Sequence, residues 1–195
     1  VPNSVFTEFT ARKLSNARFR GLGSSPANPA ITTFVDGVPV LNANASSMEL
    51  IDVDQIEFVR GPQSALFGRN TLGGLVNISS ARPSLTGWTG RLFAPLGDNG
   101  SRELRGSISG PLTDTLGVSV ALGAAQRDGF TTNSITGNLI DERKGSFGKA
   151  QLLWTPNARW ETRLIVSGER SRDGDYALSD LAGLRQNPFT VARDV

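Results

Sequence analysis

The densest group of side chains that could do acid–base chemistry in this sequence is a carboxylate cluster, Asp52, Asp54 and Glu57. Paired carboxylates can act as general acid and base, but they need a nucleophile or another titratable partner beside them. The chain contains no His and no Cys, which excludes Ser-His and Cys-His nucleophiles and also thiolate or imidazole metal sites. An ion pair with Arg60 or Arg20 explains the cluster better, so we expect no enzyme, no catalytic residue, no metal site and no cofactor.

Two further segments have compositions that are compatible with ligand binding. Residues 68–74 are rich in glycine but lack the Lys-Ser/Thr ending of a phosphate loop, and no long helix follows them. Asp173 and Asp175 could face a cation, yet the additional ligands and the distal Glu of an EF-hand loop are absent. The composition of residues 68–74 therefore indicates tight backbone turns, and the two aspartates are expected to be solvated side chains of a loop.

Net charge and hydropathy bear on whether the chain binds nucleic acid or crosses a membrane. Lys and Arg total 20 against 18 Asp and Glu, a net charge of +2, and the basic residues are scattered along the chain. Nucleic-acid binding is therefore not expected. No apolar run approaches the ~20 residues of a membrane-spanning helix, so a membrane could be crossed only by β-strands.

The first part of the chain, residues 1–84, contains short apolar stretches between glycines and prolines. We expect strands at residues 31–35, 55–60 and 75–78, because each is bounded by turn residues. Asp36-Gly37 is a strong turn dipeptide after the first strand. Gly61-Pro62 ends the second, and Pro62 is expected at the first position of a single helical turn.

The second part, residues 85–195, consists of longer segments in which apolar and polar side chains alternate. This period-2 pattern occurs in five segments, at residues 88–96, 103–112, 116–123, 149–154 and 161–169. One face of each segment avoids charge, while the other carries Arg, Lys, Glu or small residues, as is typical of transmembrane β-barrel strands. A soluble β-sandwich alternates in the same way and stays open as an alternative. Pro95 is expected at an edge or a bulge.

The connections between these segments also alternate in length. Residues 110–115 and 155–158 are expected to be tight turns, whereas residues 128–145 form a long polar loop. Outer-membrane barrels have short turns on one side and long loops on the other.

Four motifs in the first part resemble the plug domain of TonB-dependent outer-membrane receptors. They are FVDGVP at residues 34–39, IDVDQIEFVRGP at 51–62, LFGRN at 66–70 and GGLVNI at 73–78. RGLG at residues 20–23 is similar to an earlier plug segment, and RGSISGPL at 105–112 with DGF at 128–130 looks like the first barrel strands. The resemblance covers roughly residues 18–170; Phe34 stands where Tyr is more usual, and Pro95 interrupts the first barrel strand.

The resemblance implies a mainly β fold. The end of a small α+β plug domain occupies residues 1–84, and about five antiparallel strands of an incomplete transmembrane β-barrel occupy residues 85–195. Because a plugged transporter barrel takes about 22 strands, we expect the chain to be a piece of a longer protein.

The implied function is uptake of a scarce nutrient, most commonly a ferric siderophore, across the outer membrane of a Gram-negative bacterium. The expected partners are the TonB complex, reached through an N-terminal part outside this chain, the small-molecule substrate and outer-membrane lipid, with no nucleic acid. The alternative is a non-transporting β-rich binding or structural domain, whose apolar faces would pack on each other.

The resemblance also assigns candidate residues. Arg20 and Arg60 look like parts of a lock that pairs with acidic residues on the barrel wall; alternatively Arg60 pairs within the plug, with Glu57 or Asp54. The full set of lock and structural residues in the plug motifs is Arg20, Gly21, Asp36, Gly37, Glu57, Arg60, Gly61, Pro62, Gly68, Arg69, Asn70, Gly73 and Gly74. Substrate is expected at loops 24–29, 42–47 and 129–144, with the candidates Ser24, Ser25, Asn28, Asn42 and Asn44.

The alternation predicts the two faces of the barrel strands. The side chains expected to face lipid are Leu104, Ile108, Val118, Val120, Leu152, Leu164 and Val166. Those expected to face the lumen or the plug are Arg91, Glu103, Arg105, Lys149, Glu161 and Arg163, because a charge on the lipid face costs about 2–4 kcal/mol at the bilayer midplane.

Overall fold

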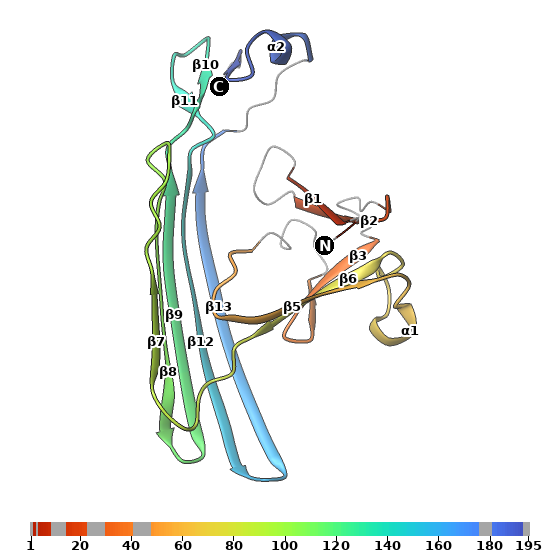
Figure 1. Ribbon diagram of the computed structural model, residues 1–195, viewed down its shortest axis with the longest axis vertical. Coiled ribbons are helices and arrows are strands. Elements are labelled where there is room, and N and C mark those ends of the chain that lie inside the picture. Colours follow the sequence, from red (N-terminus) through yellow and green to blue (C-terminus); the bar gives the residue numbers. More distant parts are fainter. Residues whose placement is uncertain are drawn as a thin grey trace. The chain divides into compact units, whose positions relative to one another are not determined.

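The structure is a computed structural model that describes residues 2, 4–8, 15–22, 30–40, 48–175 and 181–192 (Figure 1). It divides into two compact units, Val1–Ala81, the N-terminal unit, and Arg82–Val195, the C-terminal unit. Strands dominate both, which confirms the predicted mainly β fold. The described residues include no helix that is long and apolar enough to cross a membrane. The expected domain boundary after residue 84 stays a prediction.

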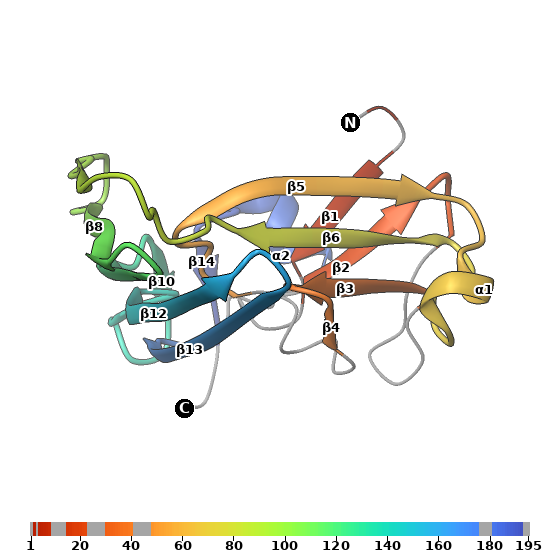
Figure 2. The same ribbon diagram turned by 90° about the horizontal axis from the view of Figure 1, so that it is seen from below.

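The N-terminal unit contains a hairpin and a four-stranded mixed sheet. In the hairpin, β1 (Ser4–Glu8) pairs with β2 (Ser15–Phe19). Figure 2 shows the sheet in the order β4-β3-β6-β5. Its strands are β3 (Ile31–Val35), β4 (Val38–Val40), β5 (Val53–Arg60) and β6 (Gly74–Ser80). β3 and β6 run parallel, while the other pairs are antiparallel.

The core of this unit is built from β2, β3 and β6. Phe19, Ile31, Val76 and Ile78 form one buried cluster, because these side chains converge from neighbouring strands. Phe58 of β5 meets Phe19 edge to face, with ring centroids 6.2 Å apart, a favoured aromatic geometry. The core therefore fixes the sheet that carries three of the four plug motifs; the fourth, at residues 66–70, lies on the connection between β5 and β6.

The short helix α1 (Ser64–Phe67) begins later than predicted. Gln63 is its N-cap residue, so Pro62 precedes the helix instead of occupying its first position. The reason is a hydrogen bond from the Gln63 N–H to the Thr71 carbonyl at 3.0 Å, which continues the β5–β6 pairing beyond Gly61. The expectation for Pro62 was therefore wrong by two residues.

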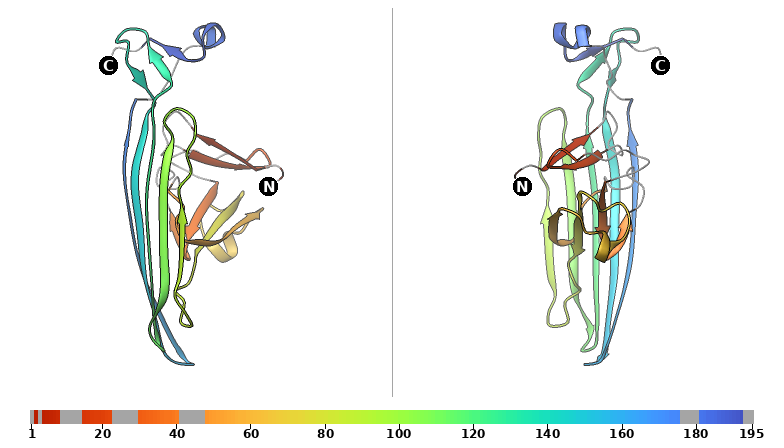
Figure 3. Two further views of the ribbon diagram at one scale, coloured as in Figure 1. Left: turned by 60° about the vertical axis from the view of Figure 1, so that its left-hand side comes forward. Right: turned by 90° about the vertical axis from the view of Figure 1, so that its right-hand side faces the viewer.

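The C-terminal unit contains a five-stranded antiparallel sheet in the order β13-β12-β9-β8-β7. Its strands are β7 (Thr89–Phe93), β8 (Arg102–Thr113), β9 (Leu116–Arg127), β12 (Arg143–Asn157) and β13 (Trp160–Asp173). Figure 3 shows the four longest of them, in green to blue, running side by side along their length. The prediction of about five antiparallel strands is confirmed.

Several strand ends differ from the sequence-based expectation. β8 continues to Thr113, so the connection to β9 is only two residues long. Within this extension Pro111 pairs with Gly117. β7 does not reach this far along β8, so no strand on that side needs the N–H that proline lacks. β12 similarly continues to Asn157, past the expected start of its turn. β7 ends before Pro95, which agrees with an edge position.

The long connection after β9 is more ordered than predicted. β12 already begins at Arg143, and the preceding residues form β10 (Thr131–Asn133) and β11 (Leu139–Ile140). β10 also pairs in parallel with β14 (Thr190–Val191), which follows helix α2 (Leu181–Gln186). A small three-stranded sheet, β11-β10-β14, therefore stands at the loop end of the long strands (Figure 1).

The strand register confirms that the seven predicted lipid-facing side chains share one face. Ile108, Val120, Ala150 and Val166 are aligned across four strands, and Val118, Leu152 and Leu164 form the next row. Val166 and Leu164 are 61% and 59% exposed. On the opposite face Ser119 and Gln151 are only 2% and 3% exposed. That the apolar face meets lipid stays a prediction.

Candidate functional site

The plug motifs begin with two tight turns that depend on the left-handed backbone region. Asp36 and Gly37 have φ of 50° and 82° and join β3 to β4, the geometry expected of an Asp-Gly hairpin. Arg20 and Gly21 have φ of 50° and 81°, and Phe19 and Leu22 exchange backbone hydrogen bonds across them. Arg20 is therefore exposed at the tip of a turn.

Asp36 does more than form its turn. One carboxylate oxygen accepts a hydrogen bond from the Ser80 backbone N–H at 2.8 Å, and the other accepts one from Ser80 Oγ at 2.7 Å. The Asp36 N–H in turn donates to the Ile78 carbonyl at 2.9 Å. Asp36 thus ties the end of β6 to the turn after β3 and satisfies groups that the parallel pair leaves open.

Glu57 and Arg60 lie on the same strand but have different partners. Glu57 accepts hydrogen bonds from Asn77 Nδ2 at 2.8 Å and from Gln55 Nε2 at 3.1 Å. Arg60 Nη1 donates to the Pro2 carbonyl at 3.0 Å. An ion pair between Glu57 and Arg60 is not among the contacts of the described residues; the Glu57 carboxylate is held by two side-chain amides.

The glycine-rich loop between β5 and β6 is closed by its own hydrogen bonds. Thr71 Oγ1 donates to the Gly68 carbonyl at 2.7 Å, and Thr32 Oγ1 donates to the Asn70 carbonyl at 2.8 Å. Gly68 and Asn70 have φ of 78° and 66°, which a β-branched residue would strain to adopt. Arg69, between them, is exposed. These hydrogen bonds and positive φ angles make residues 68–74 a tight structural turn, which the sequence favoured over a phosphate loop.

Gly74 is the most constrained glycine of the plug motifs. Its φ is 134°, and a Cβ atom added there would lie 2.2 Å from the Val59 carbonyl oxygen and 3.0 Å from the Phe19 ring. Only glycine lets β6 start this close to β5. Gly73, beside it, donates its N–H to the Ala30 carbonyl at 2.8 Å and joins the start of β6 to the residue before β3.

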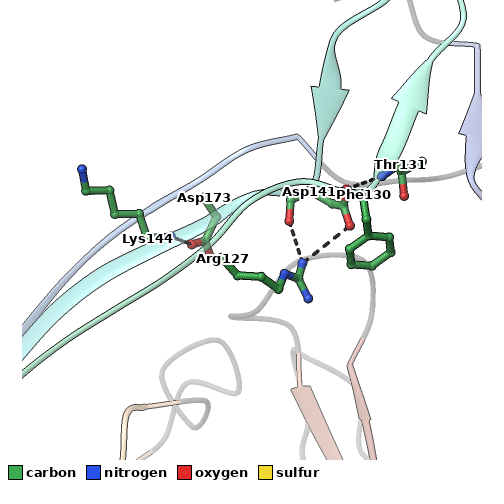
Figure 4. Close-up of polar contacts among 6 residues, drawn as sticks. All are labelled: Arg127, Phe130, Thr131, Asp141, Lys144 and Asp173. Carbon is green, nitrogen blue, oxygen red and sulfur yellow. Dashed lines mark hydrogen bonds and ion pairs between the residues drawn. The ribbon is translucent and has the colours of Figure 1, made fainter. Parts of the chain in front are cut away.

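The base of the long loop is held by one aspartate. Asp141 has φ of 63°, and its Oδ1 accepts the backbone N–H groups of Phe130 and Thr131 at 3.1 and 3.0 Å (Figure 4). Arg127 lies 3.5 Å from Asp141 Oδ2, donates to the Asp141 carbonyl at 2.7 Å, and stacks 4.7 Å over the Phe130 ring. This cluster joins the end of β9 to the start of β12 and sets the direction of the loop between them.

Charged residues on the polar face of the long sheet are also held in place. Arg105 pairs with Glu103 and lies 4.9 Å over the Phe147 ring. That ring covers Gly123 on the neighbouring strand, where a Cβ would lie 2.2 Å from it. Arg163 Nε donates to Gln151 Oε1 at 3.0 Å. Of the side chains that the sequence assigned to the lumen or plug, Glu103, Arg105 and Arg163 therefore have partners on their own face of the sheet.

The predicted ligand residues on the plug, Ser24, Ser25, Asn28, Asn42 and Asn44, lie outside the described residues. Residues that the sequence reasoning missed are Thr32, Thr71, Asn77, Ser80, Arg127 and Asp141. An aspartate placed among strand residues is a signal for the left-handed turn at Asp141. No group of three metal-ligating side chains occurs among the residues that the structure describes.

Known proteins are similar to this chain in both of its units. The family described as TonB-dependent Receptor Plug Domain matches residues 1–75. The pesticin receptor of Yersinia pestis is 34% identical over 187 residues, which cover 93% of this chain and 27% of the receptor. The ferrioxamine B receptor of Salmonella typhimurium is 34% identical over 146 residues, covering 72% of this chain and 20% of that protein.

One solved structure agrees with this chain in both sequence and fold, and a second agrees in fold. The ferric yersiniabactin uptake receptor of Yersinia pestis superposes with a TM-score of 0.79 at 30% identity, over 89% of this chain and 28% of that one. The pyoverdine receptor of Pseudomonas aeruginosa, at 20% identity and a TM-score of 0.67, shows the same fold. The chain thus spans roughly a quarter of the length of several such receptors. The plug motifs, the five-stranded sheet that follows them and the similarity across both units show that this chain belongs to the TonB-dependent receptors of the Gram-negative outer membrane.

Proposed function

We propose that the receptor containing this chain takes up a ferric siderophore through a plugged barrel and is energised by TonB. The observation that carries the proposal is the 34% identity to the pesticin receptor over 187 residues, which span the plug sheet and the long strands together. Relatives with this likeness bear the names ferrioxamine B receptor and, among solved structures, ferric yersiniabactin uptake receptor. Transport of this kind makes and breaks no covalent bond, so no catalytic residue or cofactor is proposed.

The geometry of the C-terminal unit supports a transmembrane role. Its sheet carries exposed apolar side chains on one face, while the opposite face carries charged residues that pair within that face. The N-terminal unit has its own core and its own sheet, as a plug needs. We propose the division into a plug portion at residues 1–84 and a barrel portion at residues 85–195 on this basis.

We propose the loop at residues 129–144 as one wall of the substrate site, together with plug loops 24–29 and 42–47, including Ser24, Ser25, Asn28, Asn42 and Asn44. The Asp141 cluster supports this role for the long loop, because rigid bases commonly hold binding loops. Exchanging this loop for that of a relative should alter which siderophore is taken up. Unchanged uptake after the exchange would remove the loop from the site.

We propose Arg20 and Arg60 as the lock that seats the plug against acidic residues of the barrel wall. Arg20 is exposed at its turn, and the described contact of Arg60 is a single carbonyl, so both guanidinium groups have hydrogen-bonding capacity left for a carboxylate. Substituting both by alanine in the full-length receptor should raise pore leakage. If Arg20→Ala, Arg60→Ala and the double variant all keep normal leakage and uptake, the lock assignment fails.

The transport proposal is tested by radioactive iron uptake. A strain lacking its other siderophore receptors would express the full-length receptor and be offered ferrioxamine B, ferric yersiniabactin and ferric enterobactin, each with and without functional TonB. We expect uptake of at least one of them, lost when TonB is absent. If all three are refused while the receptor is present in the outer membrane, a ferric siderophore of these types is not the substrate.

A further inference from the structure

A row of cations crosses the apolar face of the long sheet at its loop end. Arg102 of β8 is aligned with Gln126 of β9, Gln126 with Lys144 of β12, and Lys144 with Arg172 of β13. Since cross-strand partners point to the same face, these side chains form one line across four strands. Arg170, two residues before Arg172 in β13, lies on the same face and is aligned with Ser146. The four basic side chains are all exposed.

The side chains of this row point away from the loop cluster. In Figure 4 the Lys144 side chain extends to the opposite side from Arg127 and Asp141. Gln126, in the amide orientation that suits its neighbour, accepts from Arg102 Nε at 2.6 Å and Nη2 at 2.9 Å. Further toward the loop, the Asp128 carboxylate lies against Gly100 and that of Glu142 against Gly174. The aligned row thus consists of three cations and one amide, and the Asp173 carboxylate beside it accepts the Lys144 backbone N–H at 3.3 Å.

An apolar groove begins directly below the row. It is an open hollow of about 560 Å³, lined mainly by Leu92, Leu104, Ile108, Val120 and Leu122, with Gly106 and Ala124 as its floor. Arg91, Ser107 and Gly123 also contribute to the lining. The groove exists because these two small residues are aligned with leucines on the neighbouring strands, Gly106 with Leu92 and Leu122, and Ala124 with Leu104.

A second hollow connects the groove to the cations. It encloses about 240 Å³ and is lined by Arg102, Gln126 and Lys144 together with Leu104 and Ala124, which also line the groove. Glu103, a further lining residue, is paired with Arg105. The two hollows thus form one path from apolar to cationic surroundings.

The two ends of this face differ in chemistry. At the short-turn end the face finishes with Trp154 and Trp160, which are 50% and 68% exposed, as in the aromatic girdle of an outer-membrane barrel. The cationic row stands at the end that carries the long loop, which in such barrels is the extracellular end. The outer leaflet there is built from a glycolipid whose headgroup bears phosphates.

We propose that the groove and the cationic row together bind one phosphorylated lipid of the outer leaflet, with an acyl chain in the groove and a phosphate at Arg102, Lys144 and Arg172. Arginine and lysine are the side chains that recognise phosphate oxygens, and arginine does so with paired hydrogen bonds. An occupant with an apolar part at membrane depth and an anionic part at the rim is a lipid and not a soluble ligand. The inference rests on the outer-membrane placement of the receptor and not on which nutrient it carries.

The first test needs no variant. The full-length receptor in detergent would be titrated with phosphorylated lipid A, with the same lipid after removal of its phosphates, and with inorganic phosphate, and bound lipid would be counted by native mass spectrometry. We expect one phosphorylated lipid to bind much more tightly than the dephosphorylated form, without displacement by millimolar phosphate. Equal binding of the two lipids, or displacement by phosphate alone, would overturn the proposal.

The second test assigns the site. Replacing Arg102, Lys144 and Arg172 together by glutamine should weaken binding about a hundredfold, because each cation near an anionic lipid surface contributes a factor of about five. Ala124→Leu should weaken binding by filling the groove at constant charge. Arg159→Gln is the matched control. It removes an exposed cation in the turn between β12 and β13, at the other end of the sheet, and should leave the affinity for the phosphorylated lipid unchanged. Wild-type affinity in the triple variant would refute the assignment.

Iron uptake by the same variants separates this inference from the proposed function. Normal uptake with lost lipid binding supports the site and leaves transport intact. Lipid binding without any siderophore uptake would instead disprove the transport proposal and keep the lipid site.

Discussion

The small mixed sheet of the N-terminal unit and the long sheet of the C-terminal unit place their apolar side chains in opposite ways. In the first, Phe19, Ile31 and Val76 are 1–6% exposed and pack on one another. In the second, Leu164 and Val166 stand on an exposed face, while small and polar residues such as Ser119 occupy the other. Apolar groups leave water in the first sheet by packing on one another, and in the proposed barrel the second sheet would follow the same rule by turning its apolar side chains toward lipid.

The two sheets also differ in what fixes their geometry. The long sheet is held by continuous backbone ladders along β8, β9, β12 and β13, which tolerate many side chains. The plug sheet has shorter strands and relies on particular residues, among them Gly74 and the contact between Asp36 and Ser80. A single substitution should therefore destabilise the plug sheet when it disturbs the fit of the backbone. In the long sheet it should do so when the new side chain does not suit the medium that the face meets.

The largest effect is expected at Gly74. Gly74→Ala should lower the free energy of unfolding of the plug by about 4 kcal/mol or more, because its Cβ would meet the Val59 carbonyl in a backbone region closed to alanine. Gly61→Ala is the matched control: it also has a positive φ, of 100°, but open space around it, so about 1 kcal/mol is expected. Urea unfolding of the two variants in the full-length receptor makes the comparison, and equal losses would show that the close approach is not limiting.

A charge on the apolar face of the long sheet should have the next largest effect. Val120→Arg, in the middle of that face, should destabilise folding into bilayers by about 2–4 kcal/mol, whereas Leu104→Arg, nearer the cationic row, should cost about 1 kcal/mol or less. The measurement is the free energy of folding into lipid vesicles as a function of denaturant. A penalty that does not depend on position would show that this face does not lie across the hydrocarbon.

The contact between Asp36 and Ser80 should contribute less. Asp36→Ala removes the two carboxylate acceptors of the hydrogen bonds from Ser80, so the free energy of unfolding of the plug should fall by about 2 kcal/mol. Ser80→Ala removes only the hydroxyl contact and should lose about 1 kcal/mol. The denaturant midpoints of the two variants show which one is the less stable. A larger loss of stability for Ser80→Ala than for Asp36→Ala would contradict the role given to the Asp36 carboxylate.

The smallest effect is expected at the ion pair between Arg82 and Glu161. Its side chains are 58% and 47% exposed, and exposed pairs typically contribute less than about 1 kcal/mol. Arg82→Ala, Glu161→Ala and the double variant form a cycle whose coupling energy should fall further as salt is added. A coupling energy above about 2 kcal/mol, unaffected by salt, would show that this pair is sheltered in the receptor.

Much of the architecture could be predicted from the sequence because its causes are local. The Asp36-Gly37 turn follows from backbone preferences of two residues, and the five long strands follow from side-chain alternation. The ends of elements were less predictable. β8 continues through Pro111 because no neighbouring strand needs its N–H, and α1 starts after Pro62 because Gln63 pairs with Thr71.

The candidate sites were predictable only in outline. The plug motifs marked Glu57 and Arg60, but not their partners, since Asn77 is 20 residues from Glu57 and Pro2 is 58 from Arg60. The loop at residues 129–144 was recognised by its polarity and length. Nothing local in the sequence indicated that Asp141 would hold both Arg127 and the backbone of Phe130 at its base.

The sequence by itself determined the class of protein, the turn positions and which face of each strand is apolar, because these depend on residue type and on spacing within a strand. Only the tertiary structure decided which strands align and at what offset. That register placed Arg102, Lys144 and Arg172 in one row and Gly106 and Ala124 among leucines, forming the cationic row and the groove. The physical reason is that the offset between two strands depends on the turn that joins them and on the pattern of the partner strand, so it cannot be read from either strand alone.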